Sequence, residues 1–127
     1  MHYLLLIHDE EQGWGQLPEQ EQAALMQEYG AFTTELRESG AFVGANRLRP
    51  TSAASTVRVR DGETVVTDGP FTETKELIGG YWIIDVGSKQ EAVEWASRCP
   101  AADGDMIEVR QVYEMSDFPP EVRAAAQ

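Results

Sequence analysis

The chain has 127 residues, a length that suits one domain with a substantial core and is too short for two. Its 22 acidic against 10 basic residues give a formal net charge of −12, and such a surface repels phosphate backbones and anionic lipids. Nucleic acids and membranes are therefore poor candidates as partners. The single cysteine, Cys99, excludes an intrachain disulfide and favours a reducing compartment, so we expect a cytoplasmic protein.

The first part of the chain reads as strand, helix, strand. Residues 2–8 are apolar on both strand parities, which is typical of a central strand covered on both faces; they lack a basic n-region and are too short for a membrane helix. A helix should follow over residues 18–38 and end at Gly40, and residues 41–49 favour a strand. The apolar face of that helix repeats at intervals of three or four residues: Leu25, Tyr29, Phe32 and Leu36.

A β-hairpin over residues 56–67 is the clearest local prediction. The Asp-Gly dipeptide at positions 61–62 is preferred in two-residue type I′ turns, and it fixes the register so that Val57 lies opposite Val66. Asp68 has the same strand parity as Val66. We therefore expect its side chain to point inward, towards the core or a cleft.

The second half of the chain adds a strand, a helix and a strand. Residues 81–86 and 106–115 favour strands, and the helix between them should begin with a capping box formed by Ser88 and Glu91. The remaining residues, 116–127, contain two adjacent prolines and several small residues, and we expect a C-terminal tail there.

Together these elements predict an α+β domain over residues 1–115. With the hairpin as an insertion, the order is that of a ferredoxin-like βαββαβ fold, in which two helices cover one face of an antiparallel sheet. Residues 2–8 and 81–86 are apolar on both faces, and two helices cover only one. A second subunit should cover the other face, so the sequence predicts a homodimer.

The stretch 67–76, TDGPFTETKE, with Gly-Gly-Tyr at 79–81, resembles the signature of the DGPF-type branch of the YCII-related family. Residues 3–7 and 91–100 also resemble that family, so the likeness covers about residues 1–115. The resemblance implies a ferredoxin-like protomer that pairs into a dimeric α+β barrel. Other YCII-type proteins have a His–Asp pair proposed as catalytic, but no matching histidine motif is found here, and enzymatic activity is not carried over.

Asp68 and His8 are the candidate catalytic residues. Asp68 precedes Gly-Pro, where it either accepts backbone N–H groups in an Asx-type turn or handles a ligand or proton. His8 ends the first strand, and histidine is the residue type most often used for proton transfer, so His8 is either a proton carrier or a solvated or structurally hydrogen-bonded side chain. The adjacent Asp9 could orient His8 only if the strand ends before it, because neighbouring strand residues point to opposite faces.

Four further residues are candidate ligand contacts: Glu73, Lys75, Arg47 and Tyr81. Glu73 and Lys75 belong either to a solvated charge run or to a site, in which Lys75 would neutralise Asp68 or grip an anionic substrate. Arg47 could hold a carboxylate with two hydrogen bonds, or simply keep an edge strand soluble. Tyr81 and Trp82 should point to opposite faces, one under the helices and the other towards the barrel interior or the partner subunit.

Two functions remain open at this point. The first is a dimer that binds a small polar or anionic metabolite in a cleft near Asp68, with or without cofactor-independent acid–base catalysis. The second is a non-catalytic regulatory or protein-binding module, since DGPF-type proteins are often encoded beside extracytoplasmic-function sigma factors. The sequence has no metal-ligand spacing, phosphate-binding Gly-rich loop or nucleophile elbow, so we expect neither metal nor cofactor.

Overall fold

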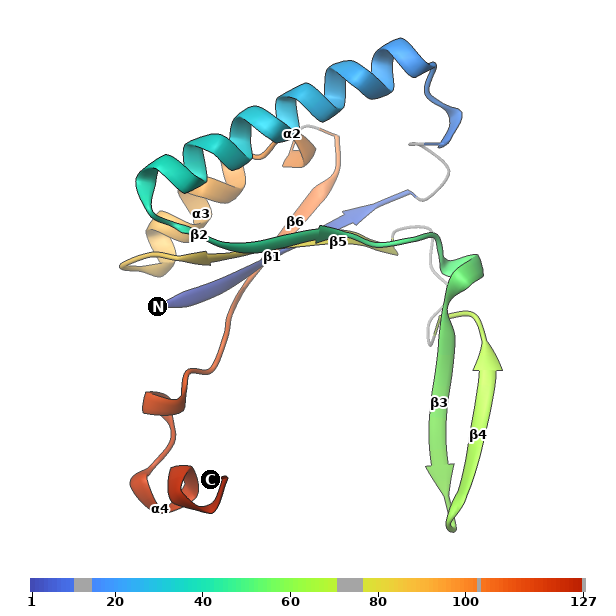
Figure 1. The fold of residues 1–127 in the computed structure, drawn as a ribbon, viewed down its shortest axis with the longest axis vertical. Coiled ribbons are helices and arrows are strands. Elements are labelled where there is room, and N and C mark those ends of the chain that lie inside the picture. The colour runs from blue at the N-terminus through green and yellow to red at the C-terminus, as the bar shows by residue number, and fades with distance from the viewer. Residues whose placement is uncertain (11–14, 71–76, 103, 127) are drawn as a thin grey trace.

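The computed structural model describes residues 1–10, 15–70, 77–102 and 104–126. The helices and strands, in chain order, are β1 His2–Asp9, α2 Glu19–Ser39, β2 Phe42–Arg47, β3 Ser55–Arg60, β4 Glu63–Asp68, β5 Leu77–Asp85, α3 Lys89–Arg98, β6 Met106–Gln111 and α4 Pro120–Ala125. One antiparallel sheet has the strand order β2-β5-β1-β6, and α2 and α3 lie on one face of it (Figure 1). This is the predicted ferredoxin-like α+β fold.

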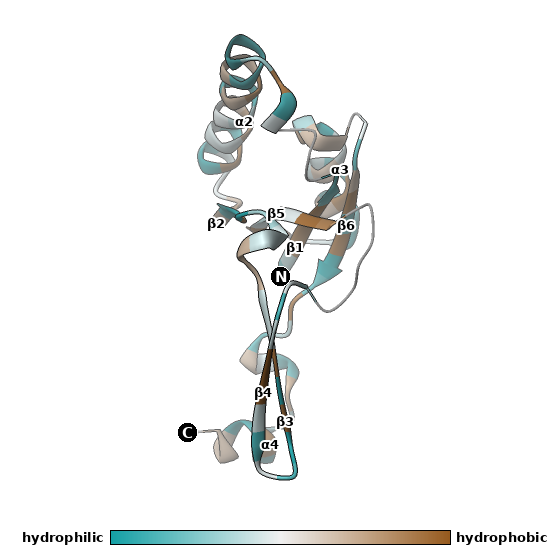
Figure 2. Cartoon of the chain, turned by 90° about the vertical axis from the view of Figure 1, so that its right-hand side faces the viewer, coloured by the Kyte–Doolittle hydropathy of each residue, from teal (hydrophilic) through white to brown (hydrophobic). Residues whose placement is uncertain are grey.

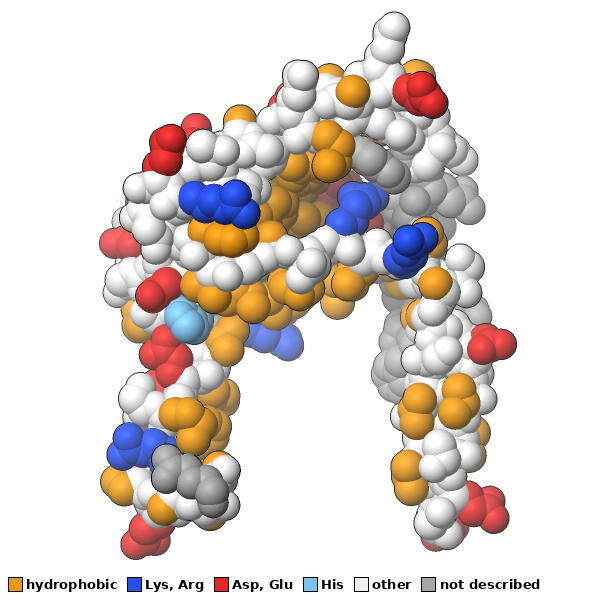
Figure 3. Space-filling view, viewed as in Figure 1, with side chains coloured by type: hydrophobic (Ala, Val, Ile, Leu, Met, Phe, Trp, Pro, Cys, Tyr) orange, Lys and Arg blue, Asp and Glu red, His pale blue; other side chains and the backbone are white. Residues whose placement is uncertain are grey.

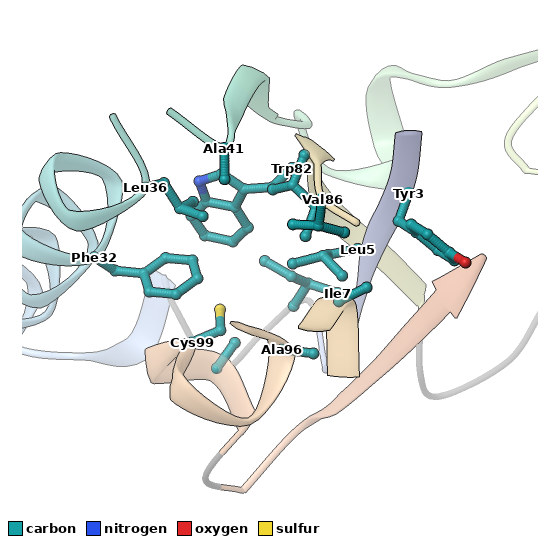
Figure 4. Packing of buried hydrophobic residues seen from close by; sticks show 13 residues of the cluster. Tyr3, Leu5, Ile7, Phe32, Leu36, Ala41, Trp82, Val86, Ala96 and Cys99 are labelled. Atoms are coloured by element: carbon teal, nitrogen blue, oxygen red, sulfur yellow. The ribbon is translucent and has the colours of Figure 1, made fainter. Parts of the chain in front are cut away.

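The hydrophobic core lies between the sheet and the two helices. Alternate residues of the central strand β1, starting from Tyr3, are buried on the helix side, and Leu5 pairs with Trp82 of β5. From α2, Phe32 and Leu36 pack down onto this layer (Figure 4). Of the predicted apolar helix face, Phe32 and Leu36 belong to the core and Tyr29 packs against it, whereas Leu25 is only partly buried and lies outside the core cluster.

Both helix termini that the sequence predicts are confirmed. Gly40 ends α2 in the left-handed conformation, with φ of 82°, which a residue with a side chain rarely adopts. The Ser88 hydroxyl accepts a hydrogen bond of 3.1 Å from the Glu91 N–H at the start of α3. The Glu91 carboxylate in turn accepts one from Gly87 rather than from Ser88, so the return bond of the capping box is displaced by one residue.

The hairpin has the predicted register but not the predicted burial. Val57 pairs with Val66 as expected, yet β3 and β4 form a separate two-stranded sheet that stands away from the main sheet (Figure 2). Both valines are 60% exposed, and Asp68 is exposed as well. The expectation that Asp68 points into a core is therefore wrong within one chain, because no other described element covers the hairpin.

The last strand is shorter than the predicted 106–115. β6 pairs with β1, and the last residue pair is Gln111 with Tyr3. The first residue of β1 is His2, so β1 offers β6 almost no further residues to pair with. The chain then leaves the sheet as an arm that carries α4. This C-terminal arm, residues 112–126, and the β3–β4 hairpin project on the side of the sheet that faces away from the helices (Figure 1).

The middle of that side of the sheet is apolar and is left uncovered by the described part of the chain. Leu4 and Leu6 of β1 point to it and are only partly buried, opposite Ile83 and Tyr81 of β5. Apolar side chains are visible along this surface between the two projecting segments (Figure 3). We call it the open face of the sheet. Among the described helices, none is long and apolar enough to cross a membrane.

Candidate functional site

A hollow of about 180 Å³ lies between α2 and the ends of β1, β2 and β5. Its wall is mostly apolar, and its charged groups are Asp9 from the end of β1 and Arg47 from the end of β2. In the space-filling view, apolar side chains line a recess beneath α2 and basic side chains lie beside it (Figure 3). We call this the bulge hollow, after the strand irregularity that forms its floor.

Two glycines of β5 create the space. The pairing of β1 with β5 shifts from Ile7–Gly80 to His8–Ile78, which leaves Gly79 as the extra residue of a β-bulge. A Cβ atom on Gly79 would lie 2.6 Å from the Asp9 carboxylate oxygens. One on Gly80 would lie 2.9 Å from the backbone oxygen of Asn46. Close approach of the β2 backbone therefore requires a glycine at position 80, whereas Gly79 makes room for the Asp9 carboxylate, and the two missing side chains leave the floor open.

Two aromatic rings form one wall of the hollow. The Tyr29 ring stacks on the Trp82 ring with centroids 5.5 Å apart, and the Phe32 ring meets Trp82 edge-on at 5.3 Å. Trp82 Nε1 is buried without a hydrogen-bond partner among the described residues. The wall is therefore flat and mostly apolar, and no described residue accepts a hydrogen bond from its buried indole N–H.

The Tyr29 hydroxyl is a neutral donor at physiological pH. Burial raises its pKa to about 12; the nearby charges of Cys99, Asp105 and Asp9 act in the same direction, and Arg47 lowers it. The charges of Asp9 and Arg47 therefore both affect the pKa of Tyr29, in opposite directions. Burial likewise raises the pKa of the Cys99 thiol to about 11, and that side chain is buried in the core.

Alkaline solution should destabilise the protein because these two acids must stay protonated in the fold. Their pKa values rise from 10.0 to about 12 for Tyr29 and from 9.0 to about 11 for Cys99. The unfolded chain loses both protons first, so the free energy of unfolding should fall as pH rises from about 9 to about 12. Urea unfolding at about pH 8 and about pH 10.5 measures the fall. The fall in unfolding free energy should be smaller in the Tyr29→Phe/Cys99→Ala double variant. An equal fall in that variant would contradict the raised pKa values of Tyr29 and Cys99.

A second hollow of about 370 Å³ adjoins the first. Asp9, Arg47 and Gly79 line both, and Arg49 lines the second only. Asp9 and Arg47 therefore lie where the two hollows meet, within reach of a molecule that occupies either.

Of the predicted ligand contacts, Arg47 and Tyr81 line the bulge hollow. The Tyr81 hydroxyl accepts a hydrogen bond of 2.9 Å from the Asn46 side chain, and Tyr81 pairs with Leu6, whose side chain lies on the open face. Trp82 is buried under α2, so the two aromatic residues point to opposite faces as predicted. Glu73 and Lys75 lie outside the described residues.

His8 is placed on the open face rather than in the hollow. Its Nε2 is 3.1 Å from Glu108 Oε1 on β6, and the second oxygen of Glu108 is 3.0 Å from Arg110 Nη2. β1 continues through Asp9, which therefore faces the other way. The idea that Asp9 orients His8 is wrong; the carboxylate beside His8 is Glu108.

Asp68 lies at the end of β4 opposite Ser55 and lines neither hollow. The turn after it is held by Gly69, whose N–H donates to the Ala54 carbonyl at 2.8 Å and whose carbonyl accepts from the Thr56 hydroxyl at 2.8 Å. A role for Asp68 in proton transfer stays a prediction.

Asp9 and Tyr29 were missed as site residues by the sequence reasoning. The signal that could have found them is the pair of glycines inside an otherwise apolar strand, which marks a bulge or a close backbone approach. In the described part of the chain, no three His, Cys, Asp or Glu side chains are grouped so that they could hold a metal ion.

The family model for the YCII-related domain matches residues 1–116, which include the whole sheet, both main helices and the hairpin. The chain belongs to the YCII-related family. This YCII-related chain is also 38% identical, over 96 residues, to an uncharacterized protein of Rhizobium meliloti (strain 1021), a match that covers 76% of this chain and 77% of that protein. The predicted family is thus confirmed, and the bulge and the hollow lie inside the matched region.

Proposed function

We propose that this YCII-related protein binds a small anionic metabolite in the bulge hollow, with Arg47 holding the anionic group. The observation that carries the proposal is the position of Arg47 at the junction of two hollows, beside the stacked Tyr29 and Trp82 rings. A guanidinium group matches a carboxylate or phosphate with two parallel hydrogen bonds, and an arginine stays charged at any physiological pH.

The size of the hollow limits the ligand. Pockets for drug-sized molecules measure about 300–1,000 Å³, and the bulge hollow measures about 180 Å³. By itself it therefore suits a small metabolite, and a longer molecule would have to extend into the second hollow. If such a ligand is turned over without a cofactor, Asp9 is the carboxylate placed to accept a proton and the neutral Tyr29 hydroxyl is the group placed to donate one.

We also propose that a second copy of the chain covers the open face of the sheet. Support comes from the apolar side chains of Leu4, Leu6 and Ile83, which no described element of the chain buries fully. The hairpin and the C-terminal arm project on the same side, where each could lie against a partner subunit (Figure 1). The alternative function as a regulatory protein-binding module stays a prediction, and the exposed hairpin valines are the feature that favours it.

Thermal unfolding against a panel of small carboxylates and phosphates tests the anion site. A compound that binds should raise the unfolding midpoint of the wild type. At a concentration 100 times its Kd, it should add about 2.7 kcal/mol to the free energy of unfolding. The Arg47→Met variant should lose this shift. Arg60→Met, which removes an exposed arginine from the hairpin, is the matched control and should keep it.

The Asp68→Asn variant distinguishes the bulge hollow from the site predicted from the sequence. We expect it to keep the shift. A shift that Asp68→Asn abolishes and Arg47→Met preserves would move the site to Asp68, and a panel without any shift in the wild type would contradict ligand binding in either place.

A further inference from the structure

The charged groups of the bulge hollow have opposite signs and border the same strip of bare backbone. β5 lies between β1 and β2, so the backbones of the two outer strands are about 10 Å apart at neighbouring-strand spacings of about 4.8 Å. Ile7, Gly80 and Arg47 form one row across these strands. Asp9 leans over Gly79, the next residue of the strip.

Each charged residue is tied closely to this strip. The Asp9 carboxylate oxygens occupy the space where a Gly79 side chain would begin, 2.6 Å from the position of its Cβ. The α carbon of Arg47 is 3.3 Å from the corresponding position on Gly80. Asp9 therefore borders the floor of the hollow from the β1 side and Arg47 borders it from the β2 side, and the two glycines between them contribute no side chains.

A simple anion fits only half of this arrangement. Its carboxylate or phosphate would meet the guanidinium group of Arg47 but would also be repelled by the carboxylate of Asp9, in a hollow where the local dielectric constant is lower than in water. A molecule that carries an ammonium group next to its carboxylate complements both the negative charge of Asp9 and the positive charge of Arg47. The remaining wall, Met26, Tyr29 and Trp82, offers an apolar surface with two stacked rings to the body of such a molecule.

We propose that the ligand is a small zwitterion with an apolar or aromatic body, such as an amino acid, whose ammonium group faces Asp9 and whose carboxylate faces Arg47. The proposal rests on the anion site proposed above and specifies its ligand class. It assigns a recognition role to Asp9, a residue that the sequence reasoning considered only as a partner of His8.

The test uses sets of three related compounds on the full-length protein. Each set contains an L-amino acid with an apolar or aromatic side chain, the same molecule without its amino group, and the same molecule without its carboxylate, for example phenylalanine, 3-phenylpropionate and 2-phenylethylamine. Titration calorimetry should give the lowest Kd for the zwitterion of at least one set. The proposal is overturned if every zwitterion binds no more tightly than its analogue without the amino group, or if no zwitterion binds.

Two variants separate this inference from the anion site itself. Asp9→Asn should weaken the zwitterion by about 10- to 100-fold, the usual effect of a lost charged hydrogen bond, and should leave the analogue without the amino group unchanged or tighter bound. Arg47→Met should weaken both carboxylates and spare the amine. Equal weakening of the zwitterion and its carboxylate analogue by Asp9→Asn would overturn the inference while leaving the anion site intact; carboxylates unaffected by Arg47→Met would overturn the anion site.

Gly79→Ala provides a third, independent readout. The new methyl group would displace the Asp9 carboxylate, which is the far end of a flexible side chain, so the protein should fold normally. Its effect on the zwitterion should match that of Asp9→Asn. A Gly79→Ala protein that is folded, as shown by circular dichroism, and binds the zwitterion like the wild type would contradict the placement of the ammonium group beside Asp9.

Discussion

Leu6→Glu should be monomeric under conditions in which the wild-type protein is a dimer. Leu6 lies in the central strand on the open face, opposite Tyr81 on one side and Glu108 on the other. In the proposed dimer the new carboxylate would be buried next to the carboxylate of Glu108, which already engages the neighbouring His8 and Arg110 side chains. An unpaired buried charge costs about 3–5 kcal/mol, and a symmetric dimer contains the change twice.

Light scattering after size exclusion gives the mass, which should be about twice 14.1 kDa for the wild type and 14.1 kDa for the variant. Leu6 is not part of the buried core, so the variant should keep its circular dichroism spectrum. Val93→Glu is a suitable control, because Val93 is 47% exposed on α3, on the other side of the sheet. A monomeric wild type, or a dimeric Leu6→Glu protein, would contradict the proposed interface.

Trp82→Ala should cost about 3–5 kcal/mol of unfolding free energy, the range for removing a large buried aromatic side chain. Trp82 is 6% exposed and holds the rings of Tyr29 and Phe32. Trp82→Phe should cost far less, about 1.5 kcal/mol or below, because it keeps most of the packed area and removes an N–H group that has no partner among the described residues.

Urea unfolding at one fixed protein concentration measures both differences, since the stability of a dimer depends on concentration. The comparison between the two variants is the informative quantity. If Trp82→Phe is nearly as unstable as Trp82→Ala, the indole N–H makes a bond that holds the fold, and the wall of the hollow is more than packing.

Helix ends and the hairpin turn were predictable because a few neighbouring residues determine them. Gly40 and Ser88 mark helix ends because their backbone conformation or side-chain bond is settled within a few residues. The Asp-Gly turn likewise fixed the hairpin register, with Val57 opposite Val66. The two-sided apolar character of residues 2–8 correctly placed that strand inside the sheet, because such a pattern reports how many faces can be buried.

The candidate site was less accessible because it depends on how three strands lie side by side. Asp9 and Arg47 are 38 positions apart, and only the β2-β5-β1 order brings both to the same two glycines. Arg47 was predicted as a ligand contact because a guanidinium group can bind a carboxylate. Asp9 was considered only as a group that orients His8, because the two residues are adjacent in sequence. The inward orientation predicted for Asp68 failed for a related reason, since strand parity defines a face but does not say whether anything covers it.

The central position of β1 affects the synthesis of the protein. Its two neighbours, β5 and β6, begin at residues 77 and 106, so the strand made first finds its partners last. At about 5–20 residues per second, the apolar segment waits on the order of 5–20 s on the ribosome before β6 is complete. Until residue 77 is made its backbone groups lack both native partner strands, and until residue 106 is made they lack β6. A nascent chain that stalls before residue 106 would therefore leave the β6 edge of this apolar strand open to chaperones and to other unfinished chains.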